Sequence, residues 1–298
     1  MQHTAKSTQS DHHPHYPRVL SIAGSDSGGG AGIQADLKTF SALGCYGMTA
    51  ITALTAQNTQ GVQGIYPVSA QFLKQQIQSV AEDIGVDAVK IGMLHTPEIV
   101  DVVCWAIEQY GWVRVVFDPV MVATSGDRLI NEETVQVLVK QLFPKVTLIT
   151  PNLDEAEVLL GRKILGINEL DDAVAALLKL GAKSALLKGG HLPGERVVDV
   201  LATHDSLKLT DSETDSGIQF QHLESERIHS RNVHGTGCTL SSAIAAHLAR
   251  GDNLLTSVSL ARGYILQAIE AGTRVSTGKP GGHGPLNHGF GPRPMMLI

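Results

Sequence analysis

The chain of 298 residues has little of what a nucleic-acid or membrane protein needs. Aromatic residues make up only 4% of it, so it lacks the rings on which unpaired bases stack. Its formal net charge of −6 opposes binding to a polyanion. No apolar run approaches the length of a membrane span. We therefore expect neither a nucleic-acid partner nor insertion into a membrane.

Cysteine is also scarce. The three cysteines, Cys45, Cys104 and Cys238, show no paired spacing, which opposes a disulfide framework. No N-terminal stretch pairs basic residues with an apolar core, as a signal peptide would. These absences predict a cytoplasmic protein. Cys45 and Cys104 are expected to serve packing, and His95 and His247 to have packing or surface roles.

Apolar residues, at 43%, are plentiful enough for a large core. Residues 1–17 are polar and rich in His, Ser and Gln, which predicts a disordered tail. Its cluster of His12, His13 and His15 lacks further ligands, which opposes a metal site. Residues 18–298 are expected to form a single domain. Within it, 272–298 is a Gly- and Pro-rich segment without periodicity, which packing could order.

Short β-rich runs alternate with helical patterns between the two ends. We expect strands at 19–23, 51–55, 88–91, 113–117, 147–150, 184–188, 197–202 and 218–223. We expect helices at 32–43, 69–84, 96–110, 132–142, 153–160, 169–180, 236–250 and 253–271, and a polar loop at 203–217. This alternation predicts an α/β fold with a mainly parallel sheet and helices on both faces. Ligands bind such folds beyond the carboxyl ends of the strands.

The helix expected at 69–84 illustrates the pattern. Ser69 is a suitable N-cap, and the apolar face is predicted to consist of Phe72, Leu73, Ile77 and Val80.

The run Asn-Val-His-Gly-Thr-Gly-Cys-Thr-Leu-Ser-Ser-Ala at 232–243 is the most informative segment. Gly235 and Gly237 can adopt positive φ and let backbone N–H groups converge, and the helix that follows adds unpaired N–H groups and its dipole. This predicts a binding site for an anion, namely phosphate. Cys238 lies in that site, where a helix N-terminus would stabilise its thiolate as a proton acceptor. The alternative is an ordinary tight turn with a core cysteine.

A second glycine-rich run, 24–32, follows the first expected strand directly. The acid that a dinucleotide-binding loop needs about twenty residues later is absent, so we interpret the run as a substrate loop. The alternative is a flexible turn. Asp36 lies on the edge of the next helix's apolar stripe, where a carboxylate needs a partner. Either a ligand amine or hydroxyl or the helix dipole would serve.

Polar residues lie at the ends of four other expected strands. Asp118, Asn152 and Glu155 are candidates for Mg²⁺, which keeps several waters and binds few carboxylates. Asn152 and Glu155 also have the spacing of a helix capping box, which spacing alone favours. Lys188 is a candidate contact for transferring phosphate oxygens, against the alternative of a solvated lysine. The Gln57 amide suits the edge of a heterocycle, although on its own a polar loop explains it better.

Taken together and in order, the motifs resemble those of hydroxymethylpyrimidine/phosphomethylpyrimidine kinases, which belong to the ribokinase-like superfamily. The matching segments are AGSDSGGGAGIQADLKT at 23–39, TAQNT at 55–59, KIGML at 90–94, TPNLDEA at 150–156, KGGH at 188–191 and HGTGC at 234–238. They span roughly residues 18–271. The resemblance implies a three-layer α/β/α sandwich, a homodimer and a role in thiamin biosynthesis. It implies ATP-dependent phosphorylation of 4-amino-5-hydroxymethyl-2-methylpyrimidine to its monophosphate and then to the diphosphate.

The resemblance also implies roles for individual residues. Those lining the pyrimidine pocket would be Gly24, Asp36, Thr55, Gln57 and Met93. Those forming the anion hole would be Gly235, Thr236, Gly237 and Cys238, with Cys238 as the base. Lys188, Asn152 and Thr236 would contact ATP, and Asp118 and Glu155 would organise Mg²⁺ directly or through water.

Two alternatives stay open. One is a pyridoxal, pyridoxine or pyridoxamine kinase on the same fold, because these compounds share a nitrogen ring bearing a hydroxymethyl group. Gln57 favours the aminopyrimidine, since an amide can match an amino group and a ring nitrogen. The other is a non-catalytic nucleotide-binding or regulatory protein. The presence of Cys238, Lys188 and Glu155 together argues against it.

Overall fold

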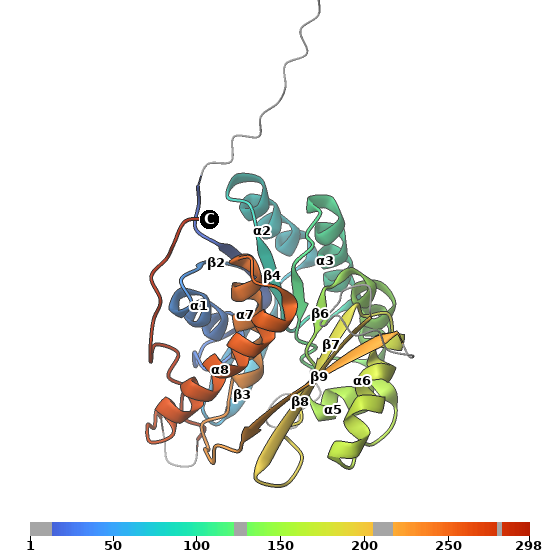
Figure 1. The fold of residues 1–298 in the computed structure, drawn as a ribbon. Helices are drawn as coiled ribbons and strands as arrows, with labels where there is room; N and C mark the ends of the chain where they lie inside the picture. The colour runs from blue at the N-terminus through green and yellow to red at the C-terminus, as the bar shows by residue number, and fades with distance from the viewer. Residues whose placement is uncertain (1–13, 122–129, 205–216, 279–281) are drawn as a thin grey trace, which may run out of the picture.

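A computed structural model of the chain describes residues 14–121, 130–204, 217–278 and 282–298. Its centre is a nine-stranded sheet in the order β3-β2-β1-β4-β5-β6-β7-β8-β9 (Figure 1). In this order, the six adjacent strands β2, β1, β4, β5, β6 and β7 pair in parallel. The strand β3 at one edge and the strands β8 and β9 at the other pair antiparallel to their neighbours. The prediction of a mainly parallel α/β sheet is confirmed.

The strands are β1 Arg18–Asp26, β2 Tyr46–Asn58, β3 Gly61–Pro67, β4 Ala88–Ile91, β5 Val115–Phe117, β6 Leu148–Ile149, β7 Ser184–Leu187, β8 Arg196–His204 and β9 Ile218–Glu226. The α-helices are α1 Gly32–Ala42, α2 Ala70–Asp83, α3 Pro97–Tyr110, α4 Glu132–Val137, α5 Leu153–Leu160, α6 Leu170–Lys179, α7 Thr236–Ala249 and α8 Leu254–Gly272. Expected and observed bounds agree at both ends for β4 and for α5.

Helices cover both faces of the sheet, which gives the expected three layers (Figure 1). Successive residues of a strand point to opposite faces, and β1 shows this directly. Val19 packs into a cluster with α1, α7 and α8. Leu20 and Ile22 pack into the other cluster, with α2 and α3. Both faces of β1 are therefore buried, as parallel sheets require.

Several expectations are wrong in detail. The strand expected at 51–55 extends over all of β2, and β3 was not expected at all. No residue of β3 is buried, so this edge strand shows no apolar alternation to detect. Phe72, placed on the buried face of α2, is 56% exposed. The helix expected at 132–142 is α4 followed by a π-helical turn at Leu138–Leu142.

The prediction of a disordered tail over residues 1–17 is wrong for the part of the tail that the structure describes. Residues 1–13, including His12 and His13, lie outside the described residues. Residues 14–17 are ordered against the C-terminus, contrary to the expected tail. The His15 carbonyl accepts from the Ile298 N–H at 2.9 Å, and the His15 imidazole lies 3.2 Å from the Asp87 carboxylate. The C-terminal segment is ordered by packing, with Leu286 buried and the Arg293 N–H donating to the Ala42 carbonyl at 2.8 Å.

Thr203 and His204 belong to β8 rather than to the loop expected at 203–217, of which 205–216 lie outside the described residues.

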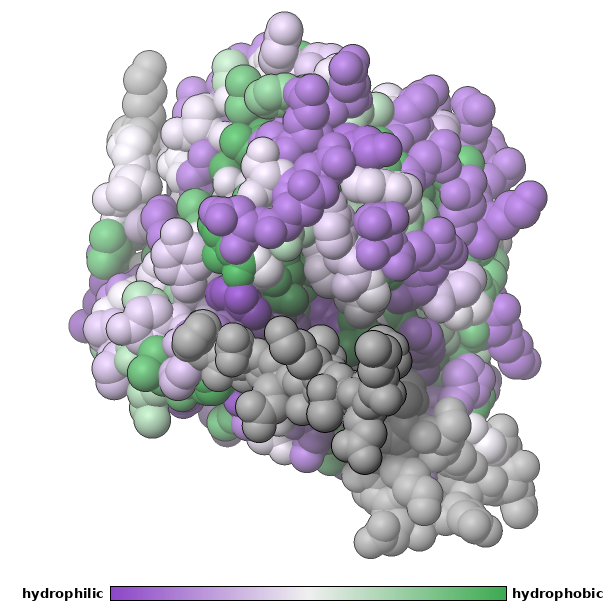
Figure 2. Space-filling model, turned by 90° about the horizontal axis from the view of Figure 1, so that it is seen from above, coloured by the Kyte–Doolittle hydropathy of each residue, from purple (hydrophilic) through white to green (hydrophobic). Residues whose placement is uncertain are grey.

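In the described parts of the chain, no helix has both the length and the apolarity to cross a membrane. Hydrophilic side chains dominate the face drawn in Figure 2, with hydrophobic residues scattered among them. Cys45 and Cys104 are free and buried, as their packing role predicts.

Candidate active site

A cavity of about 1130 Å³ opens beyond the carboxyl ends of the parallel strands. Its wall includes residues from the ends of β1, β2, β4, β5 and β7 and from the start of α7. Of the residues predicted for the site, the lining contains Gly24, Thr55, Gln57, Met93, Asp118, Asn152, Glu155, Lys188, Gly235, Thr236, Gly237 and Cys238. The structure thus brings together twelve side chains or backbone positions that are spread over more than 200 residues of sequence.

The glycine-rich loop after β1 is built around Asp26, a residue that the sequence reasoning did not single out. Its carboxylate accepts hydrogen bonds from the N–H groups of Gly28, Gly30 and Ala31 at 2.8, 3.0 and 2.8 Å. Burial would raise the pKa of Asp26, but His234 and these N–H groups outweigh it and lower the pKa. Asp26 is therefore an ionised carboxylate that fixes the backbone of this loop at the cavity wall.

The predicted anion hole lies against this loop. Gly235 has a φ of 83° and is the N-cap of α7. A Cβ at Gly235 would lie 1.9 Å from the Gly30 carbonyl oxygen, so only glycine fits here. The first helical hydrogen bond runs from the Thr239 N–H to the Gly235 carbonyl at 2.9 Å. The N–H groups of Gly237 and Cys238 therefore precede the helical ladder and, with the helix dipole, favour an anion.

Cys238 lines the cavity but does not rest as the expected thiolate. Burial raises the pKa of its thiol to about 11. The Lys90 ammonium and the Gly32 N–H favour the thiolate, but burial and the carboxylates of Asp36 and Asp118 outweigh them. The helix N-terminus thus fails to produce a low pKa, because desolvation of this half-buried side chain outweighs it. Cys238 is a thiol at neutral pH.

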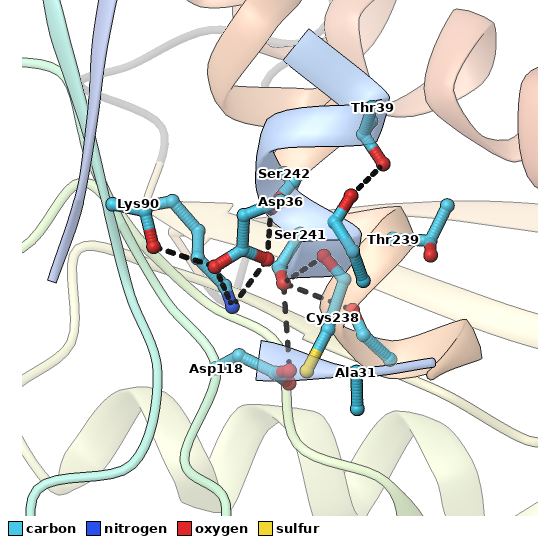
Figure 3. Close-up of polar contacts among 12 residues, drawn as sticks. Ala31, Asp36, Thr39, Lys90, Asp118, Cys238, Thr239, Ser241 and Ser242 are labelled. Atoms are coloured by element: carbon cyan, nitrogen blue, oxygen red, sulfur yellow. Dashed lines mark hydrogen bonds and ion pairs between the residues drawn. The ribbon is translucent and has the colours of Figure 1, made fainter. Parts of the chain in front are cut away.

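An ion pair of Asp118 and Lys188 forms another part of the cavity wall. Lys188 Nζ lies 3.0 Å from Asp118 Oδ1, which also accepts from Thr150 Oγ1 at 3.0 Å. Ser241 Oγ of α7 lies 3.4 Å from the other oxygen, a contact seen in Figure 3. Burial would raise the pKa of Asp118, but the charges of Lys188 and Lys90 lower it. Lys188 is therefore ion-paired and not simply solvated.

Gly237 brings the anion hole next to this ion pair. A Cβ on Gly237 would lie 3.3 Å from Lys188 Nζ and 3.4 Å from Asp118 Oδ2. The helix N-terminus, an ammonium and a carboxylate thus meet at one point of the cavity. This arrangement suits a phosphoryl group, whose oxygens need several donors and positive charge at once.

Asn152 and Glu155 form the capping box of α5 that their spacing favours. Asn152 Oδ1 accepts from the Glu155 N–H at 2.9 Å, and Glu155 Oε2 accepts from the Asn152 N–H at 2.7 Å. Burial raises the pKa of Glu155 to about 7. Asp118 and Glu155 thus offer two carboxylates at the cavity wall. Among the described residues, no group of three or more His, Cys, Asp or Glu forms a metal cluster.

Asp36 is placed differently from the expectation, because it lies behind the cavity wall rather than on it. Its carboxylate accepts from Lys90 Nζ at 2.9 and 3.0 Å, from Ser21 Oγ at 2.5 Å and from Ser242 Oγ at 2.6 Å. Figure 3 shows Asp36 between Lys90 and Ser242. Lys90 and Asp36 both have 0% exposed side chains. Both oxygens of Asp36 thus have protein partners. The Asp36 side chain is not among the residues that line the cavity.

Lys90 and His234 are further residues that the sequence reasoning left without a role. Lys90 lines the cavity and comes from β4, so a charged residue inside a four-residue apolar strand was the available signal. His234 also lines the cavity, with its Nε2 3.2 Å from the Gln57 amide nitrogen and 3.3 Å from Asp26 Oδ2. In the sequence, only the position of His234 directly before Gly235 could have indicated that it belongs to the site.

Comparison with known proteins gives consistent results. A family model described as phosphomethylpyrimidine kinase matches residues 26–287. A hydroxymethylpyrimidine/phosphomethylpyrimidine kinase of Rhizobium meliloti (strain 1021) is 47% identical over 271 residues, which cover 91% of this chain and 96% of the relative. The enzyme of the same name from Escherichia coli (strain K12) is 42% identical, with the same coverage.

Solved structures with the same fold include two kinds of kinase. Phosphomethylpyrimidine kinase from Clostridium difficile 630 has a TM-score of 0.72 and 43% identity, covering 85% of this chain and 99% of its own. An ADP complex of Bacillus subtilis pyridoxal kinase has a TM-score of 0.79 and 37% identity, covering 92% and 98%.

Proposed function

The chain belongs to the phosphomethylpyrimidine kinase family, and we propose that it phosphorylates 4-amino-5-hydroxymethyl-2-methylpyrimidine twice with ATP. The first product is the monophosphate and the second is the diphosphate, which makes the chain a thiamin-biosynthesis enzyme. The observation that carries this proposal is one cavity whose lining includes both the anion hole at the start of α7 and the Gln57 amide. A pyrimidine and the end of a nucleotide triphosphate fit such a cavity together.

The substrate ring binds against the ends of β1, β2 and β4. Gly24 gives it access, since a Cβ there would lie 3.1 Å from Met93 Cε and narrow the space. Met93 provides an apolar surface for the ring. The carboxamide of Gln57 and the hydroxyl of Thr55 supply the polar contacts for the aminopyrimidine edge.

The ATP phosphates bind between α7 and the end of β7. The N–H groups from Gly235 to Cys238 and the Lys188 ammonium surround the phosphoryl group in flight and balance its charge. Thr236 and Asn152 line the same cavity, and we assign both to contacts with the nucleotide. Asp118 and Glu155 fit Mg²⁺, directly or through water, because this ion commonly takes one or two protein carboxylates together with phosphates. When bound, Mg²⁺ neutralises the phosphate charge that Lys188 alone cannot.

The two transfers place different demands on the protein. In the first, the alcohol oxygen forms a bond to the γ-phosphorus, the bond from that phosphorus to ADP breaks, and the alcohol proton passes to the sulfur of Cys238 in its thiolate form. The second nucleophile is a phosphate oxygen that is already ionised, so it needs no strong base. Because the pKa of Cys238 is about 11, only a small thiolate fraction is available, and the first transfer accelerates with rising pH.

We also propose that the protein is a cytoplasmic homodimer. The edge strand β3 exposes Ile65 and Tyr66, at 49% and 71%, next to the exposed Leu54 of β2. Unpaired edges with apolar side chains are typical sites of pairing with a second chain. The three free cysteines fit a reducing compartment.

The experiment is product analysis by mass spectrometry. Purified protein with ATP and Mg²⁺ is given the hydroxymethyl aminopyrimidine and pyridoxal in separate reactions. We expect the pyrimidine monophosphate and then the diphosphate. Pyridoxal kinase is the second candidate, favoured by the TM-score of 0.79 to the Bacillus subtilis enzyme. Phosphate on pyridoxal alone would establish that candidate instead.

A further inference from the structure

His234 lies between the glycine-rich loop after β1 and Gln57. Its imidazole lies over Gly30, where a Cβ would come within 2.6 Å of His234 Cδ2. On another side it stacks beside His283, with ring centroids 6.3 Å apart. Its Nε2 is directed at two groups, Asp26 Oδ2 at 3.3 Å and the carboxamide end of Gln57 at 3.2 Å.

The Asp26 contact decides whether His234 Nε2 carries a hydrogen. Asp26 accepts three backbone N–H groups and is 3% exposed, so it is a carboxylate and can only accept. A lone pair on His234 Nε2 would face that negative charge at 3.3 Å. Nε2 therefore carries a hydrogen, both in the neutral tautomer that Asp26 selects and in the doubly protonated ring.

This hydrogen fixes the carboxamide of Gln57. An amide nitrogen toward His234 would set two donors face to face at 3.2 Å, whereas the amide oxygen would accept from Nε2. With the oxygen there, the amide nitrogen faces Thr55 Oγ1 at 3.2 Å. That hydroxyl can accept, because its own hydrogen goes to the Ser25 carbonyl at 2.8 Å. In this orientation alone, His234, Gln57 and Thr55 all have complementary partners.

We propose that His234 is a specificity-determining positioning residue, whose Nε2–H holds the Gln57 carboxamide in one orientation for an aminopyrimidine. The inference rests on the proposed function. Once turned this way, Gln57 presents its second N–H and its second oxygen lone pair to the cavity in a fixed order. A ring with an amino donor beside a ring-nitrogen acceptor can match that order. A hydroxymethyl pyridine without such an amino group cannot match both positions.

The test compares His234→Leu with His234→Gln, which have similar volume but differ in whether a donor is present near the position of Nε2. For each we would measure KM and kcat for the aminopyrimidine alcohol, kcat/KM for pyridoxal, and KM for ATP. We expect His234→Leu to raise KM for the aminopyrimidine about tenfold, the effect of one lost hydrogen bond, with kcat and KM for ATP changed less than about threefold. The ratio of kcat/KM for aminopyrimidine over pyridoxal falls by the same factor, and His234→Gln restores it to within about threefold.

An unchanged substrate ratio in His234→Leu would overturn the inference, as would equal losses in both variants at unchanged melting temperature. If His234→Leu does not fold, His234→Gln decides alone: retention of the wild-type ratio supports the inference and its loss contradicts it. Failure of the wild-type protein to phosphorylate the aminopyrimidine would refute the proposed function itself, and is seen before any variant is made.

Discussion

Replacing Asp36 by asparagine would leave a buried ammonium without its counter-charge. Lys90 and Asp36 are both fully buried, and Lys90 Nζ lies 2.9 and 3.0 Å from the two carboxylate oxygens. Burial alone would lower the pKa of Lys90, but the charge of Asp36 raises it well above the usual range. Asp36 is thus the nearest and largest of the charges that hold this buried lysine in its ammonium form, and Asp118 adds to it. Asparagine keeps the shape and can still bond Ser21 and Ser242, but it removes the charge.

The expected cost follows from the burial. Removing one partner of a buried ion pair costs about 3–5 kcal/mol, because the remaining charge is uncompensated. For a chain of this size that corresponds to a fall in Tm on the order of 10 °C. Lys90→Met in the Asp36→Asn background removes the stranded charge, so the double variant should recover at least half of the loss.

Urea unfolding, followed by circular dichroism, measures these free energies of unfolding. The comparison requires the same slope m in the wild type, Asp36→Asn, the double variant and the control Lys74→Met. Lys74→Met, a lysine whose ammonium lies over the Trp105 ring outside the site, controls for loss of a lysine as such. A cost below about 1 kcal/mol for Asp36→Asn would refute the argument. So would a double variant that is less stable than Asp36→Asn.

Three other variants or conditions probe the anion hole. Cys238→Ala should slow the first transfer by about 10²–10⁴-fold and the second by less than about tenfold, measured with the alcohol and the monophosphate as separate substrates; equal losses would remove the base role. Alkylation of Cys238 by iodoacetamide should accelerate roughly tenfold per pH unit from 7 to 10, because the pKa of about 11 makes thiolate the scarce form; a rate independent of pH would contradict the buried thiol. Gly235→Ala should lower stability by roughly 1–3 kcal/mol and abolish phosphoryl transfer, since its Cβ would lie 1.9 Å from the Gly30 oxygen; wild-type activity would contradict this packing.

The sequence predicted the layers and many of the residues that line the cavity, because those features have local signals. Ser69, Asn152 and Asn253 each follow the rules for helix N-caps, and all three cap their helices. The glycines at 235 and 237 mark a turn into a helix, and the helix begins at Thr236. Parallel topology then brings strand-end residues such as Asp118 and Lys188 to one edge without further information.

What sequence could not predict depends on contacts between distant segments. The raised pKa of Cys238 follows from burial in the folded site, and no local pattern reports that. Asp36 was expected on the pocket wall because Lys90, 54 residues away, could not be recognised as its partner. The edge strand β3 was missed because strand pairing with β2, rather than an apolar pattern of its own, defines it.

The central claim is that one cavity performs both phosphoryl transfers. Lys188→Met tests it most directly, with Lys183→Met as a control on an exposed lysine just before the same strand. Initial rates are measured separately with the aminopyrimidine alcohol and with its monophosphate. We predict that Lys188→Met slows both transfers by about 10²–10³-fold, because both lose the same charge at the phosphoryl group, while Lys183→Met changes neither. Retention of either transfer at the wild-type rate in Lys188→Met would contradict the claim.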